Sequence, residues 1–211
     1  MDNPWKEISL SDYENHMRLC GVRQLQTLNG VMKEQFDAFP ASSVMILGVA
    51  GGNGLEHADA RKYGAIYGID VNPGYLEEAG KRHRHLGDAL KLLCVDLTAH
   101  PKLPHADLLV ADLLIEYIGY DAFSEVVKTV QPRFISCVIQ VNEANDFVSE
   151  SPYLHAFDGL AAIHHQTDGE TLVHALAETA YKHIFSMEYP LPNGKKLLRL
   201  DFSEEAKIKT L

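Results

Sequence analysis

The stretch VMILGVAGGNGLEHA, residues 44–58, places glycines at positions 48, 51, 52 and 54 directly after a run of apolar side chains. The apolar run predicts a buried β-strand over residues 44–47. Glycine allows a tight turn and lets a ligand approach the backbone. We expect a helix over residues 54–63 after the turn, whose free N–H groups would face an anionic part of a ligand. The stretch therefore predicts a ligand-binding strand–turn–helix unit.

Strands and helices alternate beyond this unit. Apolar runs predict strands over residues 65–70, 92–95, 107–111 and 134–141, and helical patterns cover residues 72–85 and 120–130. Asn72 and Pro73 have the residue types of an N-cap and a first helical residue. Near-continuous apolar strands are typical of burial on both faces. The alternation therefore predicts a doubly wound, mostly parallel α/β sheet.

The two ends of the chain differ from this core. Residues 1–40 predict one long helix or two, starting at a capping pattern from Ser11 to Glu14 and ending at Pro40. A second capping pattern, from Thr167 to Glu170, predicts a helix to about residue 179. The run KHIFSMEYPLPNGKKLLRLDF gives two extended segments with a short connection, which must be antiparallel. We expect a single domain over residues 1–211, with a helical cover (1–40) and an α/β core (41–211) that contains a candidate lid at 142–166.

Composition excludes several classes of function. The chain has 211 residues and a formal net charge of −10, whereas a nucleic-acid surface needs clustered Lys and Arg. No apolar run reaches the roughly 20 residues of a membrane span. Three cysteines scattered along the chain argue against a disulfide framework. We expect a cytoplasmic protein that acts on neither nucleic acid nor membrane.

The glycine spacing separates two kinds of cofactor. A dinucleotide fingerprint needs Gly-x-Gly-x-x-Gly. Counted from Gly48, the chain has Ala50 and Asn53 at the second and third glycine positions, and counted from Gly52 it lacks the third glycine. A phosphate-binding P-loop is excluded because no Gly-Lys-Ser/Thr follows. Asp70 nevertheless lies where such folds place a ribose-binding acid, so an NAD(P)-dependent oxidoreductase remains an alternative.

The pattern Gly-x-Ala-x-Gly-x-Gly at residues 48–54 resembles motif I of the class I S-adenosylmethionine-dependent methyltransferases. The resemblance extends over residues 44–202 and includes Asp70, Asp96 and Asp112, which close the second, third and fourth strands. It also includes the closing antiparallel pair. It implies a seven-stranded sheet whose last strand is reversed. Two features depart from the pattern: Ile46 stands where many members have an acid, and Ala50, which suits a negative φ, replaces the second glycine.

The resemblance implies a role for each matching residue. The turn at Gly48, Ala50 and Gly52 would pass under the methionine portion of the cofactor. Asp70 would bind the ribose hydroxyls, Asp96 the adenine amino group, and Asp112 would lie beside the sulfonium. The implied cofactor-binding set is Gly48, Ala50, Gly52, Asp70, Val71, Asp96, Leu97 and Asp112. Strand ends of a parallel sheet meet at one edge, and carboxylates accept hydrogen bonds and suit a cationic cofactor.

Methyl transfer from a sulfonium is a one-step displacement, so the protein mainly aligns the groups and excludes water. Glu116 and Tyr117 follow the fourth strand and are the candidate catalytic residues, with Glu56 and His57 as weaker ones. We expect a small-molecule acceptor and no metal. A non-catalytic cofactor-binding domain is the third hypothesis.

Two segments are candidates for covering the acceptor. The candidate lid carries Tyr153, His155 and Phe157, and the N-terminal segment carries Trp5, Tyr13, His16 and Met17. For the lid residues, packing against the N-terminal helix is an equally good expectation.

Overall fold

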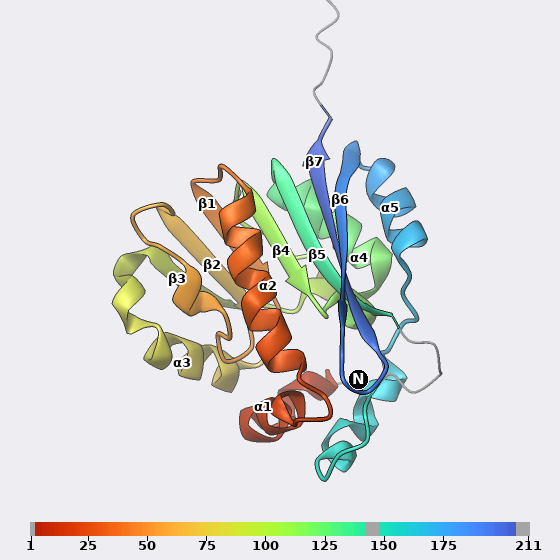
Figure 1. The fold of residues 1–211 in the computed structure, drawn as a ribbon. Helices are drawn as coiled ribbons and strands as arrows, with labels where there is room; N and C mark the ends of the chain where they lie inside the picture. The colour runs from red at the N-terminus through yellow and green to blue at the C-terminus, as the bar shows by residue number, and fades with distance from the viewer. Residues whose placement is uncertain (1–2, 142–147, 206–211) are drawn as a thin grey trace, which may run out of the picture.

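The computed structural model describes residues 3–141 and 148–205. Its centre is a seven-stranded sheet in the order β3-β2-β1-β4-β5-β7-β6 (Figure 1). The strands are β1 (Ser43–Leu47), β2 (Ala65–Asp70), β3 (Leu90–Cys94), β4 (Leu108–Asp112), β5 (Phe134–Val141), β6 (Tyr181–Pro190) and β7 (Lys196–Glu204). Strand β7 is antiparallel to both β5 and β6, and the other strands run parallel to one another. The predicted sheet with one reversed strand is confirmed.

Helices cover both faces of the sheet. The helices are α1 (Leu10–Arg18), α2 (Gln24–Ala38), α3 (Pro73–Arg82), α4 (Ile115–Val130) and α5 (Gly169–Ala177). Short 3₁₀ turns are η1 (Pro4–Lys6), η2 (Leu55–His57), η3 (Arg84–Ala89), η4 (Leu97–Ala99) and η5 (Leu154–Ala162). Alternate residues of β1 point to opposite faces, as strand geometry requires. Val44 belongs to the core shared with α2 and α3, and Met45 to the core shared with α4 and α5.

Two local predictions are confirmed in detail. Strand β5 has the predicted bounds, because its apolar run is buried on both faces. Asn72 caps α3, and its Oδ1 accepts hydrogen bonds from Gly74 N at 2.9 Å and Tyr75 N at 3.3 Å. Pro73 occupies the first turn, where its missing N–H costs nothing.

Both predicted capping boxes are displaced. Helix α1 is capped by Ser9, whose Oγ accepts from Asp12 N at 3.1 Å, and not by Ser11. Helix α5 is capped by Asp168, whose Oδ1 accepts from Thr171 N at 2.8 Å, and not by Thr167. The N-terminal residues form two helices, separated by a turn in which Arg23 has a φ of 53°.

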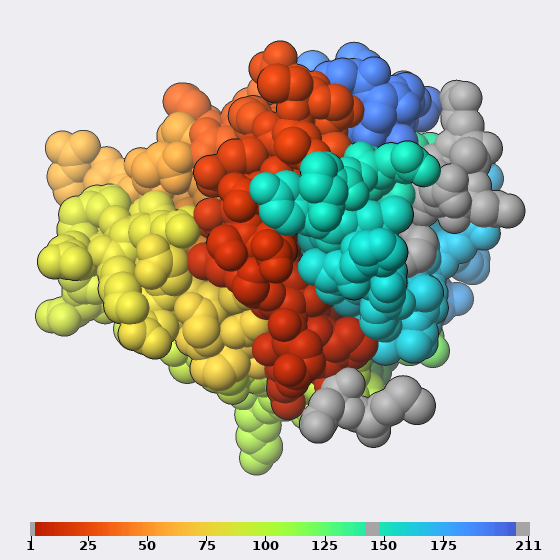
Figure 2. Space-filling view, turned by 90° about the horizontal axis from the view of Figure 1, so that it is seen from below, coloured from red at the N-terminus to blue at the C-terminus, as the bar shows by residue number. Residues whose placement is uncertain are grey.

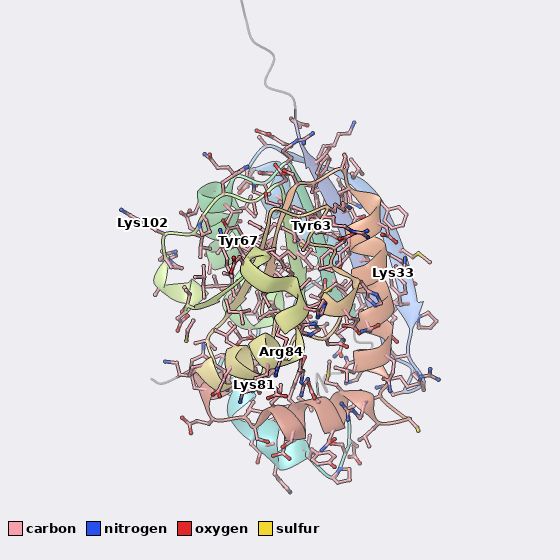
Figure 3. All side chains as sticks on the ribbon, turned by 90° about the vertical axis from the view of Figure 1, so that its left-hand side faces the viewer. Lys33, Tyr63, Tyr67, Lys81, Arg84 and Lys102 are labelled. Carbon is pink, nitrogen blue, oxygen red and sulfur yellow. The ribbon has the colours of Figure 1, made fainter. Side chains whose placement is uncertain are left out.

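The helix predicted over residues 54–63 is absent. Only the 3₁₀ turn η2 follows the glycines, and the chain is extended again at Ala58. Gly54 has a φ of 91°, and a Cβ there would lie 2.9 Å from Cβ of Met32. Helix α2, whose exposed Lys33 is labelled in Figure 3, therefore occupies the space beside β1 that the predicted helix would need. The helix N-terminus expected to face a ligand does not exist at this turn.

Within the two described ranges, no helix is long and apolar enough to cross a membrane.

Candidate functional site

The carboxyl ends of the parallel strands surround a small cavity. Of the eight residues predicted to bind a cofactor, seven line it: Gly48, Ala50, Asp70, Val71, Asp96, Leu97 and Asp112. The remaining one, Gly52, lies on the other side of the turn, where a Cβ would be 2.7 Å from Cδ2 of His83 at the end of α3. Seven of the eight predicted residues therefore meet at one edge of the sheet, whereas Gly52 does not line this cavity.

The turn itself has left-handed backbone at Gly48, Ala50 and Gly52, with φ values of 69°, 46° and 85°. The expectation of a negative φ at Ala50 is wrong. An L-residue in this conformation is strained and needs support from its surroundings. Asp70 gives that support: its Oδ2 accepts from Ala50 N at 2.9 Å, and its Oδ1 accepts from Asn72 N at 2.9 Å. One carboxylate thus holds the glycine turn and the start of α3 together.

The other two carboxyls at this edge differ in exposure. Asp112 is held by α2, because Gln35 Nε2 donates to its Oδ1 at 2.8 Å, while its Oδ2 is buried without a partner. Burial raises the pKa of Asp112 to about 7. Asp96 is partly exposed, and its Oδ1 accepts from both N and Oγ1 of Thr98, at 3.0 and 2.7 Å. Of these two carboxyls, Asp96 is the one with an exposed surface at this edge, whereas Asp112 Oδ2 is buried.

A larger cavity of about 420 Å³ adjoins the first, and both candidate catalytic residues line it. Glu116 is in the first turn of α4, only 4% exposed, and its Oε1 accepts from Gln140 N at 2.9 Å. Its Oε2 is buried with no hydrogen-bond partner among residues 3–141 and 148–205. Burial raises the pKa of Glu116 to about 7. A carboxyl of this kind can accept or release a proton near neutral pH.

Three aromatic rings stand between the two cavities, and we call Trp5, Tyr13 and Tyr117 the aromatic corner. The Trp5 ring is edge-on to both tyrosines, with centroid distances of 5.8 Å to Tyr13 and 4.9 Å to Tyr117. Each of the three rings lines both cavities. Burial raises the pKa of both tyrosines, so both hydroxyls are neutral at physiological pH.

The aromatic corner is held by the N-terminal cover, which we define as residues 3–23. Asn72 Nδ2 donates to the carbonyl of Trp5 at 2.9 Å, and the Tyr75 hydroxyl donates to that of Ile8, also at 2.9 Å. Glu14 forms an ion pair with Arg82 of α3. Figure 2, which views the carboxyl edge of the sheet, shows the red N-terminal residues across the middle of this surface. The cover therefore lies over this edge of the sheet, and its Trp5 and Tyr13 line the smaller cavity.

The segment after β5 supports the cover and contributes to the larger cavity. Phe157 packs against Ile8 and lines the cavity, and His16 Nδ1 lies 2.8 Å from Ser151 Oγ. Tyr153 joins the same apolar cluster, whereas His155 is exposed beside Asp158. Of the candidate lid, residues 142–147 lie outside the described residues.

Two weaker candidates lie away from this edge. His57 Nε2 is 2.9 Å from Asn29 Oδ1, and Glu56 Oε2 accepts from Gly54 N, so both contact α2 or the back of the turn. Sequence reasoning missed Gln24 and Gln140, which hydrogen bond to each other in the wall of the larger cavity. The position of Gln140 at the end of an apolar strand was the only available signal.

Comparison with known proteins supports the fold. No protein-family model matches the sequence, and no curated protein matches it significantly. Among solved structures, N-methyltransferase NodS from Bradyrhizobium japonicum WM9, in complex with S-adenosyl-L-homocysteine, matches with a TM-score of 0.68 and 15% identity over 97% of this chain and 100% of that one. Magnesium protoporphyrin IX methyltransferase ChlM from Synechocystis PCC 6803, with bound SAM, matches with a TM-score of 0.63 and 12% identity over 86% and 79%.

The chain has the class I methyltransferase fold. The [4+2]-cyclase SpnF also matches, with a TM-score of 0.65 and 14% identity over 90% of this chain and 85% of that one. Because a cyclase has this fold too, the reaction must be argued from the site and not from the fold.

Proposed function

We propose that this protein transfers a methyl group from S-adenosylmethionine to a small molecule held in the 420 Å³ cavity. The observation that carries the proposal is the pair of adjoining cavities at the carboxyl edge, which share the aromatic corner. One cavity has the acceptor oxygens for a nucleoside, and the other is of the size usual for small-molecule sites. A methyl group transferred at their junction would be shielded from water.

The residues present fit the cofactor in their chemistry. Asp70 and Asp96 offer acceptors for ribose hydroxyls and an adenine amino group. The unpartnered Oδ2 of Asp112 offers negative charge for the sulfonium, which supplies the activated methyl group. The chain's own residues bind and orient the reactants, and Glu116 takes up a proton from the acceptor.

The cofactor cavity is small in this structure, about 80 Å³, against the roughly 300 Å³ or more usual for a small-molecule site. The aromatic corner occupies the space between the cavities. We therefore propose that the N-terminal cover moves outward when the cofactor enters and closes again over it. Closure of this kind excludes water from the reacting groups.

Equilibrium titration of the full chain with S-adenosylhomocysteine tests the proposal, with NAD⁺ and NADP⁺ titrated in parallel. We expect micromolar binding of the methyl-donor product and none of the nicotinamide cofactors. Binding of NAD⁺ or NADP⁺ alone would favour the oxidoreductase alternative. No binding of any of the three at millimolar concentration, in a sample shown to be folded, would rule out the proposed function.

A further inference from the structure

The larger cavity contains a carboxyl that methyl transfer does not by itself require. Glu116 Oε1 is occupied by Gln140 N, and Oε2 is buried without a partner. Burying a carboxyl oxygen without a hydrogen-bond donor costs free energy. A ligand that brings a hydrogen-bond donor to this wall would relieve that cost.

Counting charges narrows the identity of the ligand. Asp112 and Glu116 are two buried carboxyls, each with one oxygen that has no partner. The cofactor proposed above brings one unbalanced positive charge, its sulfonium, which lies beside Asp112 in the proposed pose. Among the described residues that line the larger cavity, none is Lys or Arg, and the acids are Glu116 and Asp168. Burial is the main cause that lowers the pKa of His16, and the positive charge of Lys195 adds to it. Arg199, the cation that acts on Asp112, is already paired with Asp201, so a positive charge on the acceptor would balance the Glu116 carboxylate.

The aromatic corner is suited to a positive charge. Ring faces of Trp and Tyr attract cations within about 6 Å. The Trp5 ring is edge-on to Tyr13 and to Tyr117, and all three rings line the junction of the two cavities. An ammonium group between Glu116 and this corner would have a charged acceptor on one side and aromatic rings on the other.

We propose that the methyl acceptor is a small amine, which binds as its ammonium ion with an N–H donated to Glu116 and its nitrogen against the aromatic corner. This inference rests on the proposed function. A neutral alcohol or phenol would leave the charge of Glu116 unpaired, and a carboxylate would be repelled by it. The wall of the cavity thus selects the class of acceptor by charge.

The reaction balances with Glu116 as the proton acceptor. The bound ammonium gives one proton to the Glu116 carboxylate, which frees the nitrogen lone pair. The nitrogen forms a bond to the methyl carbon as the carbon–sulfur bond breaks, and sulfur keeps the electron pair of that bond. The products are the N-methylated ammonium ion, neutral S-adenosylhomocysteine and one proton, which leaves Glu116 for solvent.

The other titratable groups near Glu116 do not obscure a measurement of the protons that Glu116 takes up or releases. They are Tyr13 and His16 of α1, Asp112 of β4, Tyr117 and Tyr120 of α4, Cys137 of β5, and His164 and Asp168 beyond it. The pKa values of the tyrosines and the cysteine are raised by burial and those of the histidines are lowered by it, so these groups are neutral at pH 7. The pKa of Asp168 is lowered by hydrogen bonds from Thr171, so it stays ionised. Of the groups named in this paragraph, Asp112 is the one whose pKa is raised to the same value, and a Glu116 variant separates the two.

The test is calorimetric binding to the full chain saturated with S-adenosylhomocysteine. The probes are phenethylamine, 2-phenylethanol and 3-phenylpropionate, together with the propyl-based set of amine, alcohol and carboxylate. We expect at least one amine to bind about tenfold or more tightly than its alcohol, the scale of a hydrogen bond to a charged group. Its binding near neutral pH should release protons, measured from buffers of different ionisation enthalpy, because burial raises the pKa of Glu116 to about 7 and the ammonium favours the carboxylate form.

Two variants complete the test. E116Q should lose both the preference for amine and the proton release, while E125Q, on the exposed face of the same helix, should keep both. An alcohol or carboxylate that binds as tightly as its amine would overturn the inference, as would no amine binding at millimolar concentration. So would a Glu116 variant that behaves as wild type. Failure to bind S-adenosylhomocysteine at all would instead overturn the proposed function, so the two failures are distinguishable.

Discussion

Replacing Asp70 with Asn tests whether one carboxylate both holds the glycine turn and prepares it for the cofactor. Its two oxygens accept from Ala50 N and Asn72 N, each at 2.9 Å. An amide side chain keeps one oxygen and turns an NH₂ group towards the other backbone N–H, so one donor always faces another. Losing one hydrogen bond to a charged acceptor costs about 1.5–3 kcal/mol, so the free energy of unfolding should fall by about 2 kcal/mol.

Binding should weaken as well, because the same carboxylate is proposed to accept the ribose hydroxyls. We expect the Kd for S-adenosylhomocysteine to rise by roughly 10–100-fold. Urea unfolding measures the first effect and calorimetric titration the second.

The matched control is D96N. Asp96 uses only Oδ1, towards Thr98, and an Asn side chain can keep both of these hydrogen bonds. Its unfolding free energy should stay within about 0.5 kcal/mol of wild type. If D70N were as stable as D96N and bound the product within twofold of wild type, the role given to Asp70 would be wrong.

Three further predictions concern buried charge and the cover. Arg199→Met should lower the free energy of unfolding by about 3–5 kcal/mol, because it leaves Asp201 buried without its cation, and Asp201→Leu in the same chain should recover most of the loss in urea unfolding. Burial raises the pKa of Glu116 from 4.5 to about 7, so the native state binds more protons than the unfolded state in that range. The free energy of unfolding should therefore fall as pH rises from about 4.5 to 7. The fall should be smaller in E116Q, and an identical pH dependence in the two proteins would contradict the burial argument. Asn72→Asp keeps the cap of α3 but removes the donor to the Trp5 carbonyl, so hydrogen exchange across the N-terminal cover should become faster, and unchanged exchange would show that this contact does not hold the cover.

Local patterns in the sequence predicted what depends on local contacts. The apolar run of β5 and the Asn72–Pro73 cap are determined by residues next to one another in the sequence, and the structure has both as predicted. The capping box at Ser11 failed because Glu14 pairs with Arg82 of α3, far away in sequence, and does not turn back to its own helix. A contact of this kind leaves no periodic signal.

The same distinction holds at the site. Strand ends in a parallel sheet meet at one edge whatever surrounds them, so the positions of Asp70, Asp96 and Asp112 followed from the order of elements. The aromatic corner did not follow in the same way, because Trp5 and Tyr117 are far apart in sequence and meet only when the N-terminal segment packs against the start of α4. The predicted helix after the turn failed for a related reason, since Met32 already occupies the space at Gly54.

The absence of that helix affects how the chain can be divided. The glycine turn packs against α1 and α2, which both precede β1 in the sequence. Leu10 and Glu14 of α1 occupy the space where a Cβ of Gly51 would lie. A fragment starting at residue 41 would keep every residue of the glycine signature and lose what supports it. We expect such a fragment to be insoluble or to be stable only when the missing helices are supplied in trans, so residues 1–40 cannot be treated as a removable accessory.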